Sequence, residues 1–148
     1  MADDCFYLKV AHALTGCQLV EQELKLYISE ALELAKKFVG DKIPFKYSGS
    51  DYEDSALETL IKTFKKLSNN PQLANDLMAF KEERNFLSHK SITHCLDPDI
   101  ELSAPERAEV ESRLIAIQAE ASRLRRALHE EGNNFRGYLY FEDESDAS

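Results

Sequence analysis

The sequence contains no tryptophan, five glycines, four prolines and three cysteines in 148 residues. So little glycine and proline excludes a collagen-like chain, a linker-rich chain and a turn-dense β protein. The cysteines, Cys5, Cys17 and Cys95, are odd in number and widely spaced, which favours a reducing cytoplasm over a disulfide framework. No run approaches 18 apolar residues, so we expect no membrane span. The acidic start, residues 1–4, lacks the basic segment of a signal peptide.

Positive charge is also scarce, because 18 Lys and Arg stand against 27 Asp and Glu, a formal net charge of −9. Such a chain does not suit a passive coat of duplex DNA, where phosphate neutralisation supplies most of the affinity, so we expect no DNA partner. A small nucleic-acid site is still compatible with this charge, because the local field matters more than the total. The length and the 43% of hydrophobic residues are typical of one globular domain.

The first half of the chain predicts two helices. Apolar residues recur every three or four positions from about residue 5 to residue 39, and Gly40 stands where a helix C-cap favours glycine. A loop containing proline and glycine follows. Asp54 or Ser55 is then expected to cap a second helix that ends near residue 67.

The second half predicts two more helices. The third begins at Pro71, after a pair of asparagines, and runs to about Lys90. The fourth begins after Ser103, because Glu106 three positions on completes a capping box. The run at 132–134, Gly-Asn-Asn, is expected to stop it.

Amphipathic helices joined by short links indicate an all-α fold, an antiparallel bundle of four or five helices. We expect the bundle to occupy residues 1–131 and residues 132–148 to form an aromatic and acidic C-terminal tail, partly disordered. The aromatic run at 138–141 is expected to be a short extended segment. It either packs on the bundle or serves as a docking strand for a partner.

One group of residues, at the end of the third predicted helix, has the side chains that a catalytic or binding site needs. The apolar positions of this helix step by four and three residues, and Arg84 occupies one of them. An arginine on an apolar stripe is costly unless it is paired or faces an interface. Asn85 follows it, and His89 lies five positions on. Arginine suits phosphate binding and developing negative charge, whereas histidine acts as a general acid or base near neutral pH.

The segment Arg-Asn-Phe-Leu-Ser-His at 84–89 resembles the Arg-x4–6-His signature of the HEPN superfamily (higher eukaryotes and prokaryotes nucleotide-binding). In that family a polar residue, often Asn, follows the arginine, and the motif closes the third long helix of an all-α bundle. The resemblance implies a metal-independent endoribonuclease, a toxin or phage-defence effector, whose composite site forms at a homodimer interface. Arg84 would hold the phosphate, and His89 would activate or reprotonate the ribose hydroxyl. Asn85 would orient the imidazole or the phosphate.

The resemblance implies RNA, an antitoxin or another protein as partners, and products that carry a 2′,3′-cyclic phosphate. It implies no cofactor and no metal. Some relatives extend the motif to Arg-x4-His-x-Tyr, whose tyrosine a nucleotidyltransferase antitoxin modifies. Ser91 stands at that position here, so the sequence departs from that form of regulation.

Other interpretations of the same residues stay open. Arg84 can form a structural salt bridge to Glu21, Glu23 or an acid of another helix, and His89 can be a helix C-terminal cation stabilised by the macrodipole. The alternative function is a non-catalytic HEPN-like module that binds a protein partner or a nucleotide. His89, His94 and Cys95 lack the paired spacing of a zinc site, so we expect no metal.

Two other regions of the chain carry clusters of basic residues. The lysines between residues 36 and 66 share this stretch with several acidic residues and form either a solvated mixed surface or a flanking track for RNA. Arg123, Arg125 and Arg126 are expected to lie on a solvated helix face.

Overall fold

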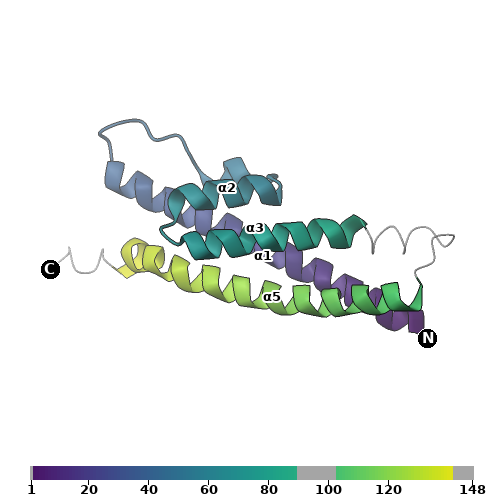
Figure 1. The fold of residues 1–148 in the computed structure, drawn as a ribbon. Coiled ribbons are helices and arrows are strands. Elements are labelled where there is room, and N and C mark those ends of the chain that lie inside the picture. The colour runs from purple at the N-terminus through teal and green to yellow at the C-terminus, as the bar shows by residue number, and fades with distance from the viewer. Residues whose placement is uncertain (1, 90–102, 142–148) are drawn as a thin grey trace.

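The structure, a computed structural model, describes residues 2–89 and 103–141 (Figure 1). Within these residues every regular element is helical, which confirms the all-α prediction. None of the described helices combines the length and the apolar composition that a membrane span requires. The elements are α1 (Ala2–Val39), the 3₁₀ turn η1 (Gly49–Tyr52), α2 (Leu57–Leu67), α3 (Pro71–Leu87), α5 (Ala104–Arg136) and the π-helical turn η3 (Gly137–Phe141).

The two long helices, α1 and α5, lie side by side and run in the same direction (Figure 1). Lys9 pairs with Glu111 near their starts, at 3.5 Å, and Glu30 pairs with Arg136 near their ends, at 3.1 Å. Between these pairs Gly16 faces Ala121 so closely that a Cβ at Gly16 would lie 3.0 Å from the alanine methyl group. The glycine therefore sets how near the two helices approach.

The third helix crosses this pair in the opposite direction. Asp76, early in α3, pairs with Arg123, late in α5, whereas Glu83, late in α3, pairs with Arg113, early in α5. The predicted antiparallel arrangement therefore holds for α3 against α5. It does not hold for α1 against α5, because the link at 40–56 turns back along α1 before α2 begins.

Glycine again permits the close contact in this link. Gly49 of η1 lies on α1, where a Cβ would come within 2.4 Å of the Ser29 hydroxyl.

The apolar stripes of the four helices meet in one core. A single buried Leu, Ile or Phe side chain contributes about 1.5–3 kcal/mol, so these stripes supply the main force that holds the bundle together. The largest fully buried side chains are Phe6, Leu24, Ile28, Leu57, Leu60, Ile61, Phe64, Leu77, Leu87, Leu114, Leu124 and Leu128.

Several helix ends follow the local signals. Gly40 has a φ of 59° and donates its backbone N–H to the Lys36 carbonyl, so it is the predicted C-cap of α1. The Asn70 side chain accepts a hydrogen bond from the Leu73 N–H at the start of α3. The predicted capping box of α5, between Ser103 and Glu106, is formed.

The predicted cap of α2 is wrong. Its N-cap is Ala56, which has no side-chain hydrogen bond, rather than Asp54 or Ser55. The Ser55 N–H donates to the Tyr52 carbonyl, at 3.1 Å, so Ser55 belongs to the turn that follows η1. The N-cap of α2 is therefore one residue later than Ser55.

The predicted end of α5 is also wrong, because the helix continues through residues 132–134 to Arg136. Gly132 is buried, and the Arg136 guanidinium folds back beside it, 3.3 Å from where a Cβ would stand. That guanidinium donates to a Glu30 carboxylate oxygen on α1 and to the His129 carbonyl, each at 3.1 Å. This anchoring on α1 offsets the weak helix propensity of the glycine.

The aromatic run that follows is helical rather than extended. Residues 137–141 form η3, and Lys37 donates its ammonium to the Tyr138 carbonyl at 3.1 Å. This part of the expected tail therefore packs on the end of α1. Residues 142–148 lie outside the described residues.

Candidate functional site

Residues 84–89 form the last turn of α3 and the step beyond it. Leu87 is fully buried and fixes this turn in the core. Arg84, on the side of α3 that faces α1, keeps 37% of its side chain exposed. Asn85 and His89 are exposed. All three candidate residues are thus accessible to a ligand at the C-terminal end of α3.

The Arg84 guanidinium meets the Glu21 carboxylate of α1, and the closest nitrogen and oxygen are 3.4 Å apart. The salt bridge that we considered as an alternative is therefore present. The separation is longer than a good charge-assisted hydrogen bond, and a guanidinium has five N–H donors. Arg84 can therefore still bind an anion from the solvent side.

A buried thiol lies behind this ion pair. Cys17, one turn before Glu21 on α1, is 2% exposed. Burial raises its pKa to about 11, the Arg84 charge lowers it and the Glu21 charge raises it. The thiol is therefore neutral at pH 7, so the surface beneath the Arg84 side chain is uncharged at this point.

Asn85 and His89 are four residues apart and so share one side of the helix, whereas Arg84 and His89 do not. Five residues of continuous α-helix separate two side chains by about 140°. The chain stays α-helical up to Leu87 and becomes π-helical at Ser88 and His89, so most of this angle remains. A single chain therefore does not bring Arg84 and His89 to one point.

Arg113 of α5 holds this end of α3 in place. It donates to both carboxylate oxygens of Glu83, from Nε at 3.1 Å and from Nη2 at 2.8 Å. Its guanidinium carbon also lies 3.5 Å from the centre of the Phe86 ring. The hydrogen bonds to Glu83 raise the Arg113 pKa. Sequence analysis missed this residue, because nothing local to position 113 indicates a partner thirty positions away.

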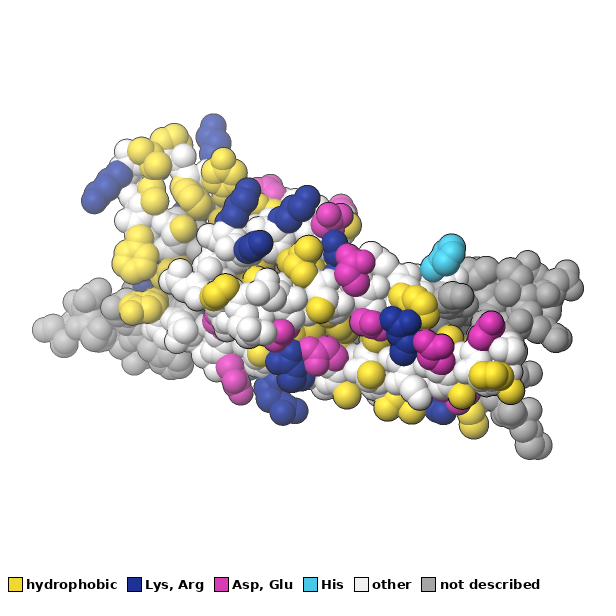
Figure 2. All heavy atoms as spheres, in the orientation of Figure 1, with side chains coloured by type: hydrophobic (Ala, Val, Ile, Leu, Met, Phe, Trp, Pro, Cys, Tyr) yellow, Lys and Arg dark blue, Asp and Glu magenta, His cyan; other side chains and the backbone are white. Residues whose placement is uncertain are grey.

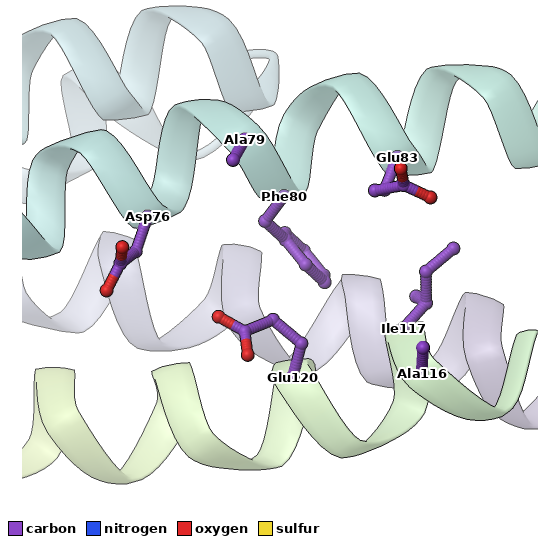
Figure 3. A pocket seen from close by; sticks show the side chains of 7 residues that line it. All are labelled: Asp76, Ala79, Phe80, Glu83, Ala116, Ile117 and Glu120. Carbon is purple, nitrogen blue, oxygen red and sulfur yellow. The ribbon is translucent and has the colours of Figure 1, made fainter. Parts of the chain in front are cut away.

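A hollow of about 280 Å³ lies between α3 and α5, beside the contact of Arg113 with Glu83 (Figure 3). Phe80 and Ile117 form an apolar floor, and Asp76, Glu83 and Glu120 form the rim. These three acids outnumber the two arginines that pair with them, Arg113 and Arg123, so the rim keeps a net negative charge that disfavours a phosphate.

Arg123 is exposed, as we expected for a solvated helix face. It pairs with Asp76 at 3.0 Å and with Glu120, and both hydrogen bonds raise its pKa. It therefore joins α3 to α5 at the far end of the hollow.

Among the described residues, no group of three or more His, Cys, Asp or Glu side chains is arranged to hold a metal ion. His94 and Cys95, which we considered with His89 for zinc, lie outside the described residues.

Comparison with known proteins adds no family: no protein-family model, no curated protein and no solved structure matches the chain.

Proposed function

We propose that this protein is a metal-independent endoribonuclease of the HEPN type, a toxin or phage-defence effector that works as a homodimer in the cytoplasm. The observation that carries the proposal is the accessible end of α3, where Asn85 and His89 are exposed and Arg84 is only partly neutralised by Glu21. The free thiols Cys5 and Cys17 fit a reducing compartment.

The proposed reaction is attack of a ribose 2′-hydroxyl on the adjacent phosphorus. His89 accepts the hydroxyl proton, the 2′ oxygen bonds to phosphorus, and the 5′ oxygen of the next nucleotide leaves. A histidine returns a proton to that leaving oxygen. Arg84 binds the phosphate oxygens and stabilises the charge that develops on them, while Asn85 orients the imidazole or the phosphate. The products end in a 2′,3′-cyclic phosphate and a 5′-hydroxyl.

A homodimer is part of the proposal because Arg84 and His89 diverge on their own helix. In a two-fold interface the same surface of each subunit meets the other, so Arg84 of one chain can face the partner subunit's His89. Two such pairs then lie around one cleft, and each pair is a site with its own phosphate ligand and its own proton carrier. The angle between the side chains is the physical reason for a composite site.

A second candidate, a non-catalytic module that binds a protein partner or a nucleotide, is favoured by the Arg84–Glu21 ion pair. In that case the ion pair joins α3 to α1, and Asn85 and His89 are ordinary surface residues. An antitoxin or another regulatory protein would then be the partner.

Cleavage of a mixed RNA pool in the presence of EDTA tests the first candidate. Wild type is expected to produce fragments with cyclic-phosphate ends, and His89→Ala is expected to produce none. His12→Ala, which removes an exposed histidine from α1, is the matched control and should cleave like wild type. If well-folded wild type leaves the pool intact, or if His89→Ala cleaves like wild type, the nuclease proposal is wrong.

A further inference from the structure

The two most exposed large hydrophobic side chains of the described residues, Phe38 and Tyr47, lie at the end of α1 and in the link that follows it, and Ile43 lies between them in the sequence. Phe38 is 68% exposed, Tyr47 65% and Ile43 58%. Figure 2 shows hydrophobic side chains among Lys and Arg side chains over this end of α1 and over α2, at the upper left. The centres of the Phe45 and Tyr47 rings are 5.6 Å apart, whereas the Phe38 ring packs against Tyr138, with ring centres 6.4 Å apart.

The same stretch is strongly basic in a chain whose net charge is −9. Residues 36–47 contain four lysines and a single acidic residue, Asp41. No ion pair of the described residues involves Lys36, Lys42 or Lys46. These ammonium groups therefore create a local positive potential that is available to a ligand.

A hollow of about 300 Å³ opens beside these groups. Lys36 and Tyr47 line it, together with the hydroxyls of Ser29, Ser48 and Ser50 and the carboxylate of Glu33. Volumes of this order are typical of small-molecule sites. Hydroxyls, a carboxylate and an ammonium provide partners for the polar edge of a base, for a sugar and for a phosphate.

The wall of this hollow is fixed by packing rather than left to a free loop. Gly49 rests on Ser29, with no room for a side chain, and the Ser48 N–H donates to the Asp51 carboxylate at 3.1 Å. Tyr47 is therefore held beside α1 before any ligand arrives, which reduces the entropy that a ligand must remove on binding.

We propose that this surface, formed by Lys36, Lys42, Lys46 and Tyr47, binds single-stranded RNA. Aromatic rings that stack on bases and cations that follow the backbone are the common features of single-strand binding sites. An anionic membrane fits less well, because an interfacial segment needs a continuous apolar face, whereas here serine hydroxyls and Glu33 interrupt it.

The choice of RNA over DNA rests on the proposed nuclease function, and the surface is separate from the candidate site. Glu21, which contacts Arg84, precedes Lys36 by fifteen residues of α1, a distance of about 22 Å. A strand that reaches both places needs about six or seven stacked nucleotides at about 3.4 Å each. The surface would thus select longer strands and hold them beside the cleavage site.

Fluorescence anisotropy of a labelled 12-nucleotide RNA tests the inference, with His89→Ala as the background so that the probe stays intact. Tyr47→Ala is expected to weaken binding about tenfold, as the loss of one stacked base does. Tyr7→Ala removes an exposed tyrosine from the other end of α1 and should bind like the background. Circular dichroism checks that each variant keeps its helices.

The salt dependence gives a second readout that a structural role of these residues would not change. Replacing Lys42 and Lys46 by Ala should reduce the slope of log affinity against log salt by about 1.4, since each phosphate contact on a single strand contributes about 0.7. Lys9→Ala is the matched control and should leave the slope unchanged.

Unchanged affinity in Tyr47→Ala with an unchanged slope in the lysine variant would overturn the inference. Binding to anionic lipid vesicles without binding to the RNA would also overturn it. Failure of the nuclease proposal has a different signature, because wild type would then leave RNA uncleaved whatever the anisotropy shows.

Discussion

Glu21→Gln is the most informative single substitution, because it separates the structural role of Arg84 from its proposed role in phosphate binding. The substitution keeps the size of the side chain and removes its charge. If Glu21 competes with phosphate for the Arg84 guanidinium, removing that charge should strengthen RNA binding. If the ion pair mainly joins α3 to α1, removing it should chiefly destabilise the fold.

The structure indicates how large the stability loss should be. Two unit charges about 4 Å apart attract by about 4 kcal/mol near a protein surface and by about 1 kcal/mol in water. Arg84 is 37% exposed and Glu21 is 20% exposed, and their closest atoms are 3.4 Å apart. Desolvation and side-chain entropy offset most of the attraction in such exposed pairs, so the net value is about 0.2–1 kcal/mol. For a chain of this size, that lowers Tm by about 4 °C at most.

Thermal unfolding and RNA anisotropy on the same preparations check both expectations. Glu21→Gln should unfold within a few degrees of wild type and bind the 12-nucleotide RNA more tightly, whereas Arg84→Ala should bind it more weakly. Glu23→Gln is the matched control, because Glu23 lies on the same helix and pairs with His129 instead. A loss of several kcal/mol with no gain in RNA binding would refute the reasoning and favour the non-catalytic module.

Three further predictions test the fold. Gly16→Val should destabilise the protein by about 1–3 kcal/mol in urea unfolding, because the new side chain overlaps α5. The control Ala11→Val, at an exposed position of the same helix, should cost less, and equal losses would contradict the close packing at Gly16. Arg136→Ala should cost about 3 kcal/mol or more, because Glu30 is 6% exposed and loses its cation, and an unchanged Tm would contradict the anchoring. Burial raises the Cys17 pKa from 9.0 to about 11, so the unfolded thiol ionises first. The unfolding free energy should therefore fall between about pH 9 and pH 11, and the fall should be smaller in Cys17→Ala, where Tyr27, whose pKa burial raises to about 12, still contributes; an equal fall would contradict the burial of the thiol.

Local signals predicted most helix ends, because the contacts that form those ends lie within a few residues. The C-cap at Gly40, the asparagine cap before Pro71 and the box of Ser103 with Glu106 are all of this kind. The end of α5 could not be predicted in this way. Gly132 stays helical because Arg136 reaches Glu30, a contact between residues 106 positions apart.

The direction of the helices depended on the link at 40–56, which sequence analysis treated only as a loop. Its return along α1 depends on the contact of Gly49 with Ser29, and no periodicity in the sequence encodes that contact. Short links alone favoured alternating directions, so the parallel packing of α1 and α5 was missed.

At the candidate site, too, some contacts could be predicted from the sequence and others could not. The position of Arg84 on an apolar stripe correctly indicated that it needs a partner, and Glu21 was among the acids considered. The ion pair of Arg113 with Glu83 and its contact with the Phe86 ring could not be predicted, because they join α5 to α3 through tertiary packing alone.

Complementation between two inactive variants tests the composite site most directly. Arg84→Ala and His89→Ala are each expected to be inactive. In a mixed dimer one site loses both residues, while the other keeps an intact Arg84 from one chain and an intact His89 from its partner. Because half of randomly assorted dimers are mixed and each has one intact site, the mixture should recover about a quarter of the wild-type cleavage rate. No recovery from a mixture that is shown to exchange subunits, alongside an active wild type, would contradict a site shared between two chains.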